Sequence, residues 1–187
     1  MSALEFRRYD ASTVLSATAT VEAVFRGAYI QALEEGDPFG TPEAFMTRFA
    51  SYARNPGIDL VAAVENGEPV GQAWGWPLAA NNRWWEGLAA EPEPGFTNEN
   101  GTRTFALSEI MVIREHTGQG IAHALHDELL RGRCEQRATL LVRPANTTAY
   151  TAYARWGWRK ASQLRPHWPG SPLFDVLMLS LPLQPTG

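Results

Sequence analysis

The sequence contains one cysteine, Cys134, and one lysine, Lys160, among its 187 residues. A single cysteine excludes an internal disulfide, which agrees with a reducing compartment. The net charge of −4 argues against a nucleic-acid partner, because phosphate contacts need clustered basic side chains. No apolar run approaches the roughly 20 residues that cross a bilayer, and the N-terminal residues lack the apolar core of a signal peptide. We therefore expect a cytoplasmic protein with no nucleic-acid partner and no membrane partner.

The composition is otherwise that of an ordinary globular protein. Hydrophobic residues make up 44% and charged residues 19% of the chain, which argues against disorder and against a fibrous architecture. The length is typical of one core, so we expect a single domain over residues 1–187.

A short strand and two helices are predicted in the N-terminal part. Residues 4–9 form the strand, and Asp10 is the expected N-cap of a first helix whose apolar residues, from Val14 to Phe25, recur at helical spacing. A break at residues 36–40 precedes Thr41-Pro42, an N-cap followed by proline at the first helical position, which predicts a second helix.

The next segments are a hairpin and a long loop. Residues 60–64 and 70–76 flank Asn66-Gly67, the typical pair of a type I′ turn between two antiparallel strands. Residues 81–103 are polar and broken by proline and glycine, and exceed the usual length of a connection. Long ordered loops are often functional, although a merely variable insertion explains the segment equally well.

The remaining residues predict a strand over 104–113, a helix within 118–131, a strand over 138–142, a helix over 146–156 closed by Gly157, and a hairpin from Trp158 and residues 173–181. The element order predicts an α/β (α+β) fold with a mixed, mostly antiparallel sheet of about seven strands and four flanking helices.

Two glycines stand where a strand turns into a helix, in Thr117-Gly118-Gln119-Gly120. Backbone amides at such a turn, together with the helix N-terminus, suit phosphate oxygens, although an ordinary tight turn explains the glycines as well. A Walker loop is excluded because no Gly-Lys-Ser/Thr is present. A dinucleotide fingerprint is disfavoured because His123 stands where its third glycine belongs.

Residues 107–158 resemble the GNAT (Gcn5-related N-acetyltransferase) family in two motifs. The acetyl-CoA loop of the family is similar to the segment from Thr117 to Ala122, and a later helix is similar to Asn146-x-x-Ala149-x-x-x-Tyr153-x-x-Trp156-Gly157-Trp158. The resemblance implies that the fourth and fifth strands splay apart and that pantetheine lies between them.

The resemblance also implies which residues contact acetyl-CoA. The pyrophosphate would rest on the turn, and the thioester carbonyl would meet a backbone amide near Met111 or Val112 at a bulge, an oxyanion donor worth about 3 kcal/mol in acyl transfer. Asn146 is similar to a cofactor-contacting asparagine, although an N-cap alone explains it. The implied cofactor-binding residues are Met111, Val112, Thr117, Gly118, Gln119, Gly120, Ile121, Ala122, Asn146 and Tyr153.

The chain departs from the family pattern at two positions. Thr117 stands where the family usually has Arg or Gln, and Arg114 where it often has Pro. Exchanging a charged donor for a hydroxyl costs about 1 kcal/mol of contact energy, so we expect acetyl-CoA binding of ordinary strength.

Two side chains are candidates for proton transfer. Glu109 interrupts an apolar strand and is the expected general base, although it could also face solvent or pair with an arginine. His116 is a second candidate base within the turn. Tyr153 resembles the family tyrosine that protonates the leaving thiolate, although its spacing also suits a core tyrosine.

Aromatic residues not explained by folding suggest where an acceptor binds. Adjacent Trp84 and Trp85 in the polar loop, with Tyr29 after the first helix, are the candidate substrate residues. The loop also carries Glu86, Glu91, Glu93 and Glu99, and acidic and aromatic groups together suit a cationic amine, although a solvated acidic loop explains the glutamates as well.

The sequence therefore predicts an N-acetyltransferase that moves the acetyl group of acetyl-CoA to the primary amine of a small molecule, with no metal ion. Three alternatives stay open: a peptide or protein amine as acceptor, a non-catalytic acyl-CoA-binding module, and a nucleotide-binding module without specificity for coenzyme A. A homodimer is compatible with the family resemblance.

Overall fold

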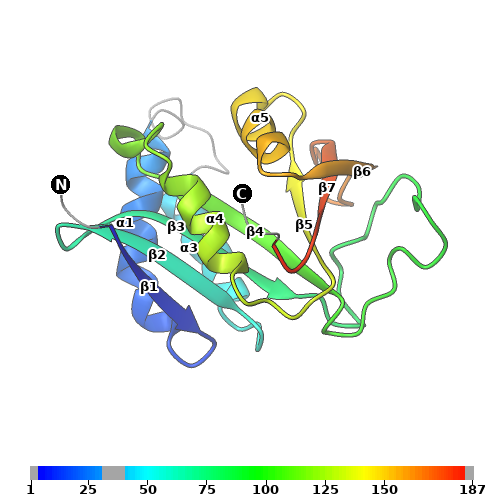
Figure 1. Ribbon diagram of the computed structural model, residues 1–187, viewed down its shortest axis with the longest axis horizontal. Coiled ribbons are helices and arrows are strands. Elements are labelled where there is room, and N and C mark those ends of the chain that lie inside the picture. The colour runs from blue at the N-terminus through cyan, green and yellow to red at the C-terminus, as the bar shows by residue number, and fades with distance from the viewer. Residues whose placement is uncertain (1–3, 31–40, 184–187) are drawn as a thin grey trace. The chain divides into compact units, whose positions relative to one another are not determined.

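The computed structural model describes residues 4–30 and 41–183 (Figure 1). The chain forms two compact units. The first unit comprises Met1–Trp76 and Glu109–Arg131, and the second unit comprises Pro77–Ser108 and Gly132–Gly187. The break predicted at residues 36–40 lies outside the described residues.

Seven strands form one hydrogen-bonded sheet in the order β1-β2-β3-β4-β5-β7-β6. Antiparallel pairs join β1 to β2, β2 to β3, β5 to β7 and β6 to β7, whereas β4 and β5 are parallel. The predicted mixed sheet is confirmed. The strands are β1 (Glu5–Asp10), β2 (Asp59–Glu65), β3 (Glu68–Pro77), β4 (Thr104–Val112), β5 (Arg137–Val142), β6 (Arg159–Leu164) and β7 (Phe174–Ser180).

The described ranges contain four α-helices, as predicted: α1 (Thr18–Ala28), α3 (Pro42–Tyr52), α4 (Ile121–Leu130) and α5 (Thr147–Arg155). Short 3₁₀ helices cover Val14–Ala17 and Arg114–His116. None of the helices in these ranges is long and apolar enough to cross a membrane.

In the first unit, helices cover both faces of the strands. Figure 1 shows α1 and α3 on one side of β2 and β3, and α4 on the other. Phe25 of α1 stacks on Phe45 of α3 with ring centroids 4.0 Å apart, and Phe45 and Phe49 pack on the fully buried Trp74 of β3. Each such side chain contributes about 2 to 3 kcal/mol through burial of apolar surface. This core holds α3 against the sheet.

Local residue choices explain where most elements begin. The Thr41 hydroxyl accepts a hydrogen bond from the Ala44 amide and Pro42 opens α3, as predicted. Asn66 and Gly67 both have positive φ, 53° and 86°, which confirms the type I′ turn. Asp10 differs from its prediction: its carboxylate accepts from the amides of Ser12 and Thr13, and the chain enters a 3₁₀ turn before α1.

Strand β4 is irregular along both of its edges. The parallel ladder with β5 covers three residue pairs, from Thr104 with Arg137 to Ala106 with Thr139, although both strands continue further. On the β3 side, Leu78 N–H donates to the Thr104 carbonyl and Ile113 N–H donates to the Val70 carbonyl. Between these two hydrogen bonds, β4 has one residue more than the segment of β3 that it faces. One extra residue in one strand of an antiparallel pair indicates a β-bulge.

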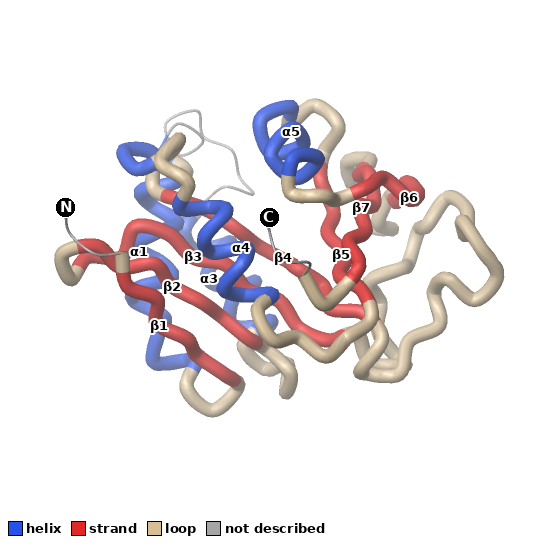
Figure 2. The backbone as a smooth tube through the Cα atoms, viewed as in Figure 1, coloured by secondary structure: helices blue, strands red, loops and turns tan. Residues whose placement is uncertain are grey.

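The segment between β3 and β4 has no helix or named strand (Figure 2). An isolated bridge pairs Leu88 with Leu164 of β6, and the Ala89 amide donates to the Gln163 carbonyl. The long loop is therefore an ordered part of the second unit.

Candidate active site

The turn between β4 and α4 carries a row of backbone amides. Gly118 and Gly120 have φ of 76° and 81°, a left-handed conformation that glycine adopts at little cost, and a Cβ at either position would meet nothing within 4 Å. The amides of residues 118–120 make no backbone hydrogen bond within the described ranges. Those of Ile121 and Ala122 lie in the first turn of α4, where helix geometry supplies no acceptor. This open cradle of donors at a helix N-terminus fits a pyrophosphate.

The side chains of the turn hold its shape. The Thr117 hydroxyl donates to the Arg114 carbonyl at 2.8 Å, and the Gln119 amide donates to the Glu115 carbonyl at 3.3 Å. The His116 Nδ1 lies 3.4 Å from a Glu65 carboxylate oxygen. Because the Thr117 hydroxyl proton is used within the turn, the backbone amides are the donors that the turn presents.

Glu109 of β4 belongs to the same unit as the turn. The residue is half-buried, and burial of its carboxyl group raises the pKa to about 7, although the charge of Arg48 on α3 opposes this shift. No hydrogen bond or ion pair from Glu109 to another described residue is found. Glu109 is thus a carboxyl group that changes charge near neutral pH, which suits a general base.

Tyr52 at the end of α3 interacts with Glu109. Burial raises the pKa of the Tyr52 phenol, the charge of Glu109 raises it further, and Arg48 lowers it. The Tyr52 ring lies 5.0 Å from that of Trp76 on β3. Neither Tyr52 nor Arg48 was predicted from the sequence to belong to the site. Their helical spacing predicts a helix face, but their proximity to Glu109 depends on how α3 packs on the sheet.

Met111 and Val112 close β4 beside the turn. Met111 is buried, and its sulfur accepts a hydrogen bond from the Gln72 side chain at 3.3 Å. The extra residue of β4 lies between Thr104 and Ile113, a range that contains both candidate oxyanion donors. This range is the whole of β4, so the position of the extra residue at Met111 or Val112, and their function as oxyanion donors, stay predictions.

In the second unit, Tyr153 and Asn146 lie on and before α5. Tyr153 is buried, and its ring meets those of Trp156 and Trp158 edge-on, with centroids 5.5 and 6.2 Å away. Asn146 caps the helix, because its side-chain oxygen accepts from the Ala149 amide at 3.2 Å. The capping function of Asn146 is confirmed, whereas contacts of both residues with a cofactor stay predictions.

The three candidate substrate residues lie in different surroundings. Trp85 is buried in the long loop, where its indole N–H donates to Glu99 at 3.2 Å and its ring packs on Phe96. Trp84 is half-buried, and Tyr29 is partly exposed and stacks on Phe25. Trp85 therefore forms part of the core of the loop, whereas contacts of Tyr29 and Trp84 with an acceptor stay predictions.

The glutamates of the loop are bound within the second unit. Glu99 pairs with Arg137 at 3.2 Å, Glu86 pairs with Arg83 at 2.8 Å, and Glu91 accepts from the Thr97 hydroxyl. Two of the four glutamates thus have an arginine partner, and of these Glu99 is buried whereas Glu86 is exposed. Glu99 is therefore part of the structure of the loop.

The profile of the Acetyltransferase (GNAT) family matches residues 26–158 of the chain. A crystal structure of an acetyltransferase from Thermus thermophilus superposes with a TM-score of 0.62 at 16% identity, covering 97% of this chain and 100% of that chain. No curated protein sequence matches significantly.

Two further structures contain the cosubstrate or its product. A GNAT family acetyltransferase from Elizabethkingia anophelis with acetyl-CoA bound has a TM-score of 0.59 at 14% identity over 95% of this chain and 98% of that chain. The PaiA N-acetyltransferase of Thermoplasma acidophilum in complex with coenzyme A has a TM-score of 0.55 at 11% identity over 96% and 99%. At these identities the similarity shows the fold. Because the family profile itself spans most of the chain, the protein belongs to the GNAT acetyltransferase family, with acetyl-CoA as its cosubstrate.

Proposed function

We propose that the protein transfers the acetyl group of acetyl-CoA to the primary amine of a small molecule. The observation that carries the proposal is Glu109, a half-buried carboxyl group with a pKa raised to about 7, on the strand that leads into the glycine turn. A carboxyl group whose pKa is raised by burial costs folding free energy, and such groups concentrate where they serve chemistry.

The acceptor explains why a base is needed. An alkyl amine with a pKa of about 10.4 is roughly 0.1% neutral at pH 7, so attack on a thioester carries a penalty of about 4 to 5 kcal/mol without assistance. In the proposed reaction a carboxylate oxygen of Glu109 takes the proton of the ammonium group. Its raised pKa brings it closer to that of the amine than an ordinary glutamate would be, which favours this transfer.

Other residues of the chain are proposed to bind the cofactor, stabilise the oxyanion and protonate the leaving sulfur. Acetyl-CoA supplies the acetyl group as an activated thioester. The amides of residues 118–122 bind its pyrophosphate, and the amide of Met111 or Val112 donates to the developing oxyanion. Tyr153 holds the proton that the leaving sulfur receives, as the family resemblance implies, and Asn146 contacts the cofactor.

The acceptor is proposed to be a cation with an apolar part. Tyr52 and Trp76 form an aromatic pair that interacts with Glu109 through Tyr52, and aromatic faces beside a carboxylate favour ammonium groups. Tyr29 and Trp84 are further candidate contacts. A compact amine is proposed as this cation, and a cytoplasmic location, which is also proposed, would give access to acetyl-CoA.

The first experiment is calorimetric titration of the purified protein with acetyl-CoA, followed by thiol-release assays on matched panels of small amines and of peptides. We expect micromolar binding and turnover of small amines. Turnover of the peptides but not of the small amines would contradict the proposal and indicate a peptide amine as the acceptor. Binding without turnover of either panel would favour a non-catalytic acyl-CoA-binding module.

The second experiment tests Glu109. We expect Glu109→Gln to bind acetyl-CoA normally and to lose about 10²-fold or more in kcat, since general bases contribute 10²–10⁴-fold. The wild-type rate should fall as the pH drops through about 7, where Glu109 becomes protonated, and the variant should lack this limb. A variant with turnover within about twofold of wild type at every pH contradicts the assignment.

A further inference from the structure

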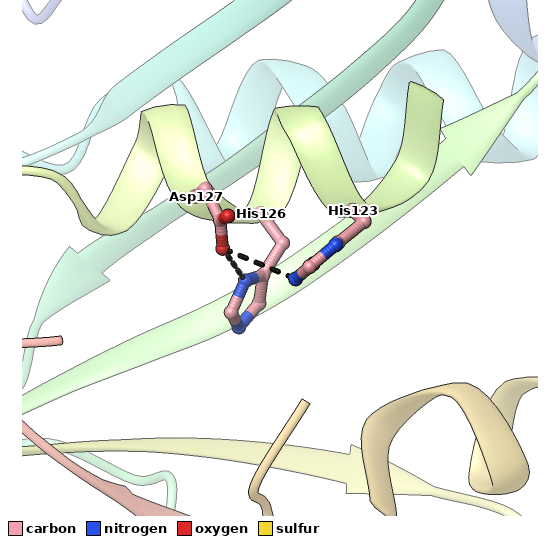
Figure 3. A group of neighbouring side chains, drawn as sticks. All are labelled: His123, His126 and Asp127. Carbon is pink, nitrogen blue, oxygen red and sulfur yellow. Dashed lines mark hydrogen bonds and ion pairs between the residues drawn. The ribbon is translucent and has the colours of Figure 1, made fainter. Parts of the chain in front are cut away.

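Helix α4 carries a group of side chains that the proposed reaction does not use. His123, His126 and Asp127 stand at positions i, i+3 and i+4, and therefore lie on one side of the helix. Figure 3 shows the two imidazoles and the carboxylate converging. One ligand atom of each residue lies within 4.8 Å of the other two. The Asp127 Oδ1 is 2.7 Å from His126 Nδ1 and 3.5 Å from His123 Nε2.

Two imidazole nitrogens and one carboxylate oxygen are a common ligand set of Zn²⁺ and similar transition metal ions. In the tetrahedral geometry of Zn²⁺, bonds of about 2.1 Å place two ligand atoms about 3.4 Å apart. The ligand atoms of the group, which lie within 4.8 Å of one another, must therefore move closer together on binding. The side chain of His123 is 43% exposed and is the one of the two imidazoles with solvent beside it.

His126 is 1% exposed, so its imidazole needs a hydrogen-bond partner within the protein. The ordinary explanation is a hydrogen bond from His126 to Asp127 that satisfies a buried ring. That explanation does not account for His123, whose ring lies 5.9 Å from the ring of His126 and whose nitrogen is directed at the same carboxylate oxygen.

We propose that His123, His126 and Asp127 form a binding site for a divalent transition metal ion of the Zn²⁺ type. The site uses side chains of α4, whereas the cosubstrate is proposed to contact backbone amides of the preceding turn and of the start of the same helix. Three protein ligands leave a coordination position for water or for a further ligand.

The test is metal binding to the full chain after removal of any affinity tag, treatment with EDTA and dialysis. Titration with ZnCl₂ should give one site, and CoCl₂ should give the visible absorption bands of a protein-bound cobalt ion. We expect His123→Ala and Asp127→Asn to weaken binding at least about 10-fold, because each removes a ligand. Both residues are partly exposed, so these variants should fold, which circular dichroism verifies.

Two control variants remove metal-binding groups elsewhere. His167→Ala deletes an exposed histidine of the second unit, and Cys134→Ser deletes the exposed thiol. Both should bind Zn²⁺ and Co²⁺ like the wild type. The proposal is overturned if the wild type shows no saturable binding of either ion, or if His123→Ala and Asp127→Asn bind them as tightly as the wild type does.

Discussion

At the scale of single residues, Glu109 connects activity with stability. Its pKa is raised by burial to about 7, from an ordinary value of 4.5, so the folded protein holds this proton over a range in which the unfolded chain has lost it. Stability therefore decreases as the pH rises from about 4.5 through 7. The raised pKa that suits Glu109 to act as a base near neutral pH therefore lowers the free energy of unfolding at that pH.

Replacement of the Glu109 carboxyl group should remove this loss of stability. We expect Glu109→Gln to raise the free energy of unfolding by up to about 3 kcal/mol at pH 8, where the wild-type carboxylate is charged, and to have no such effect at about pH 5. Urea unfolding at the two pH values measures the difference. Glu115→Gln, at an exposed glutamate of the same unit, is the matched control. An equal gain at both pH values would contradict the assignment of the raised pKa to Glu109.

The glycine turn permits a second prediction. Gly118→Ala places a Cβ on a residue with φ of 76° and in open space, so the folding cost should be about 1 to 2 kcal/mol of backbone strain. We expect the same Cβ to crowd the proposed pyrophosphate site, so that acetyl-CoA binds at least about 10-fold more weakly, the effect of about 1.4 kcal/mol. Calorimetry measures the affinity.

A matched glycine separates the two effects. Gly67 of the hairpin turn has φ of 86° and equally open surroundings, so Gly67→Ala should show the same folding cost. Its affinity for acetyl-CoA should equal that of the wild type. If both variants bind acetyl-CoA equally, the turn after β4 is not the pyrophosphate site.

At the scale of elements, the sequence predicts those helix starts and turns that depend only on residues adjacent in the chain. Thr41-Pro42 begins α3, and Asn66-Gly67 turns the hairpin, because capping and positive φ are local requirements. Asp10 shows the limit of such signals: the same side chain can cap an α-helix or start a 3₁₀ turn. The proximity of Tyr52 to Glu109 was not predicted, because no local pattern links a helix end to a distant strand.

The long loop shows the same limit. Trp85 and Glu99 suggested an aromatic and acidic surface, but both are buried around Arg137, a residue of β5 distant in sequence. The Arg137 guanidinium donates to the Thr104 hydroxyl, the Phe96 carbonyl and Glu99, and lies 4.5 Å from the centroid of the Phe96 ring. Arg137 thus adds to the contacts with β6 that hold the loop in place.

Arg137→Met should destabilise the protein strongly. It leaves the Glu99 carboxylate, whose side chain is 0% exposed, without its cationic partner, and loss of one partner of a buried pair costs about 3 to 5 kcal/mol. Urea unfolding measures the loss. Arg83→Met breaks the exposed pair with Glu86 and should leave stability unchanged within error. Equal effects of the two variants would show that the Arg137 pair does not hold the loop.

At the scale of the whole molecule, the proposed functional residues belong to both units. Glu109 and the glycine turn are in the first unit, whereas Tyr153 and Asn146 are in the second. A ligand that binds the native protein alone stabilises it by mass action, about 2.7 kcal/mol at 100 times its dissociation constant. For a chain of this length that free energy raises Tm by about 5 to 10 °C.

We therefore expect acetyl-CoA to raise Tm by this amount, and ATP and NADPH to leave it unchanged, in thermal unfolding followed by fluorescence. The selectivity has a physical basis: the turn lacks the lysine of a Walker loop and the third glycine of a dinucleotide fingerprint. Gly118→Ala should need at least about 10-fold more acetyl-CoA for the same shift. An equal shift with ATP would indicate a general nucleotide site and would remove the specificity for coenzyme A on which the proposed acetyl transfer depends.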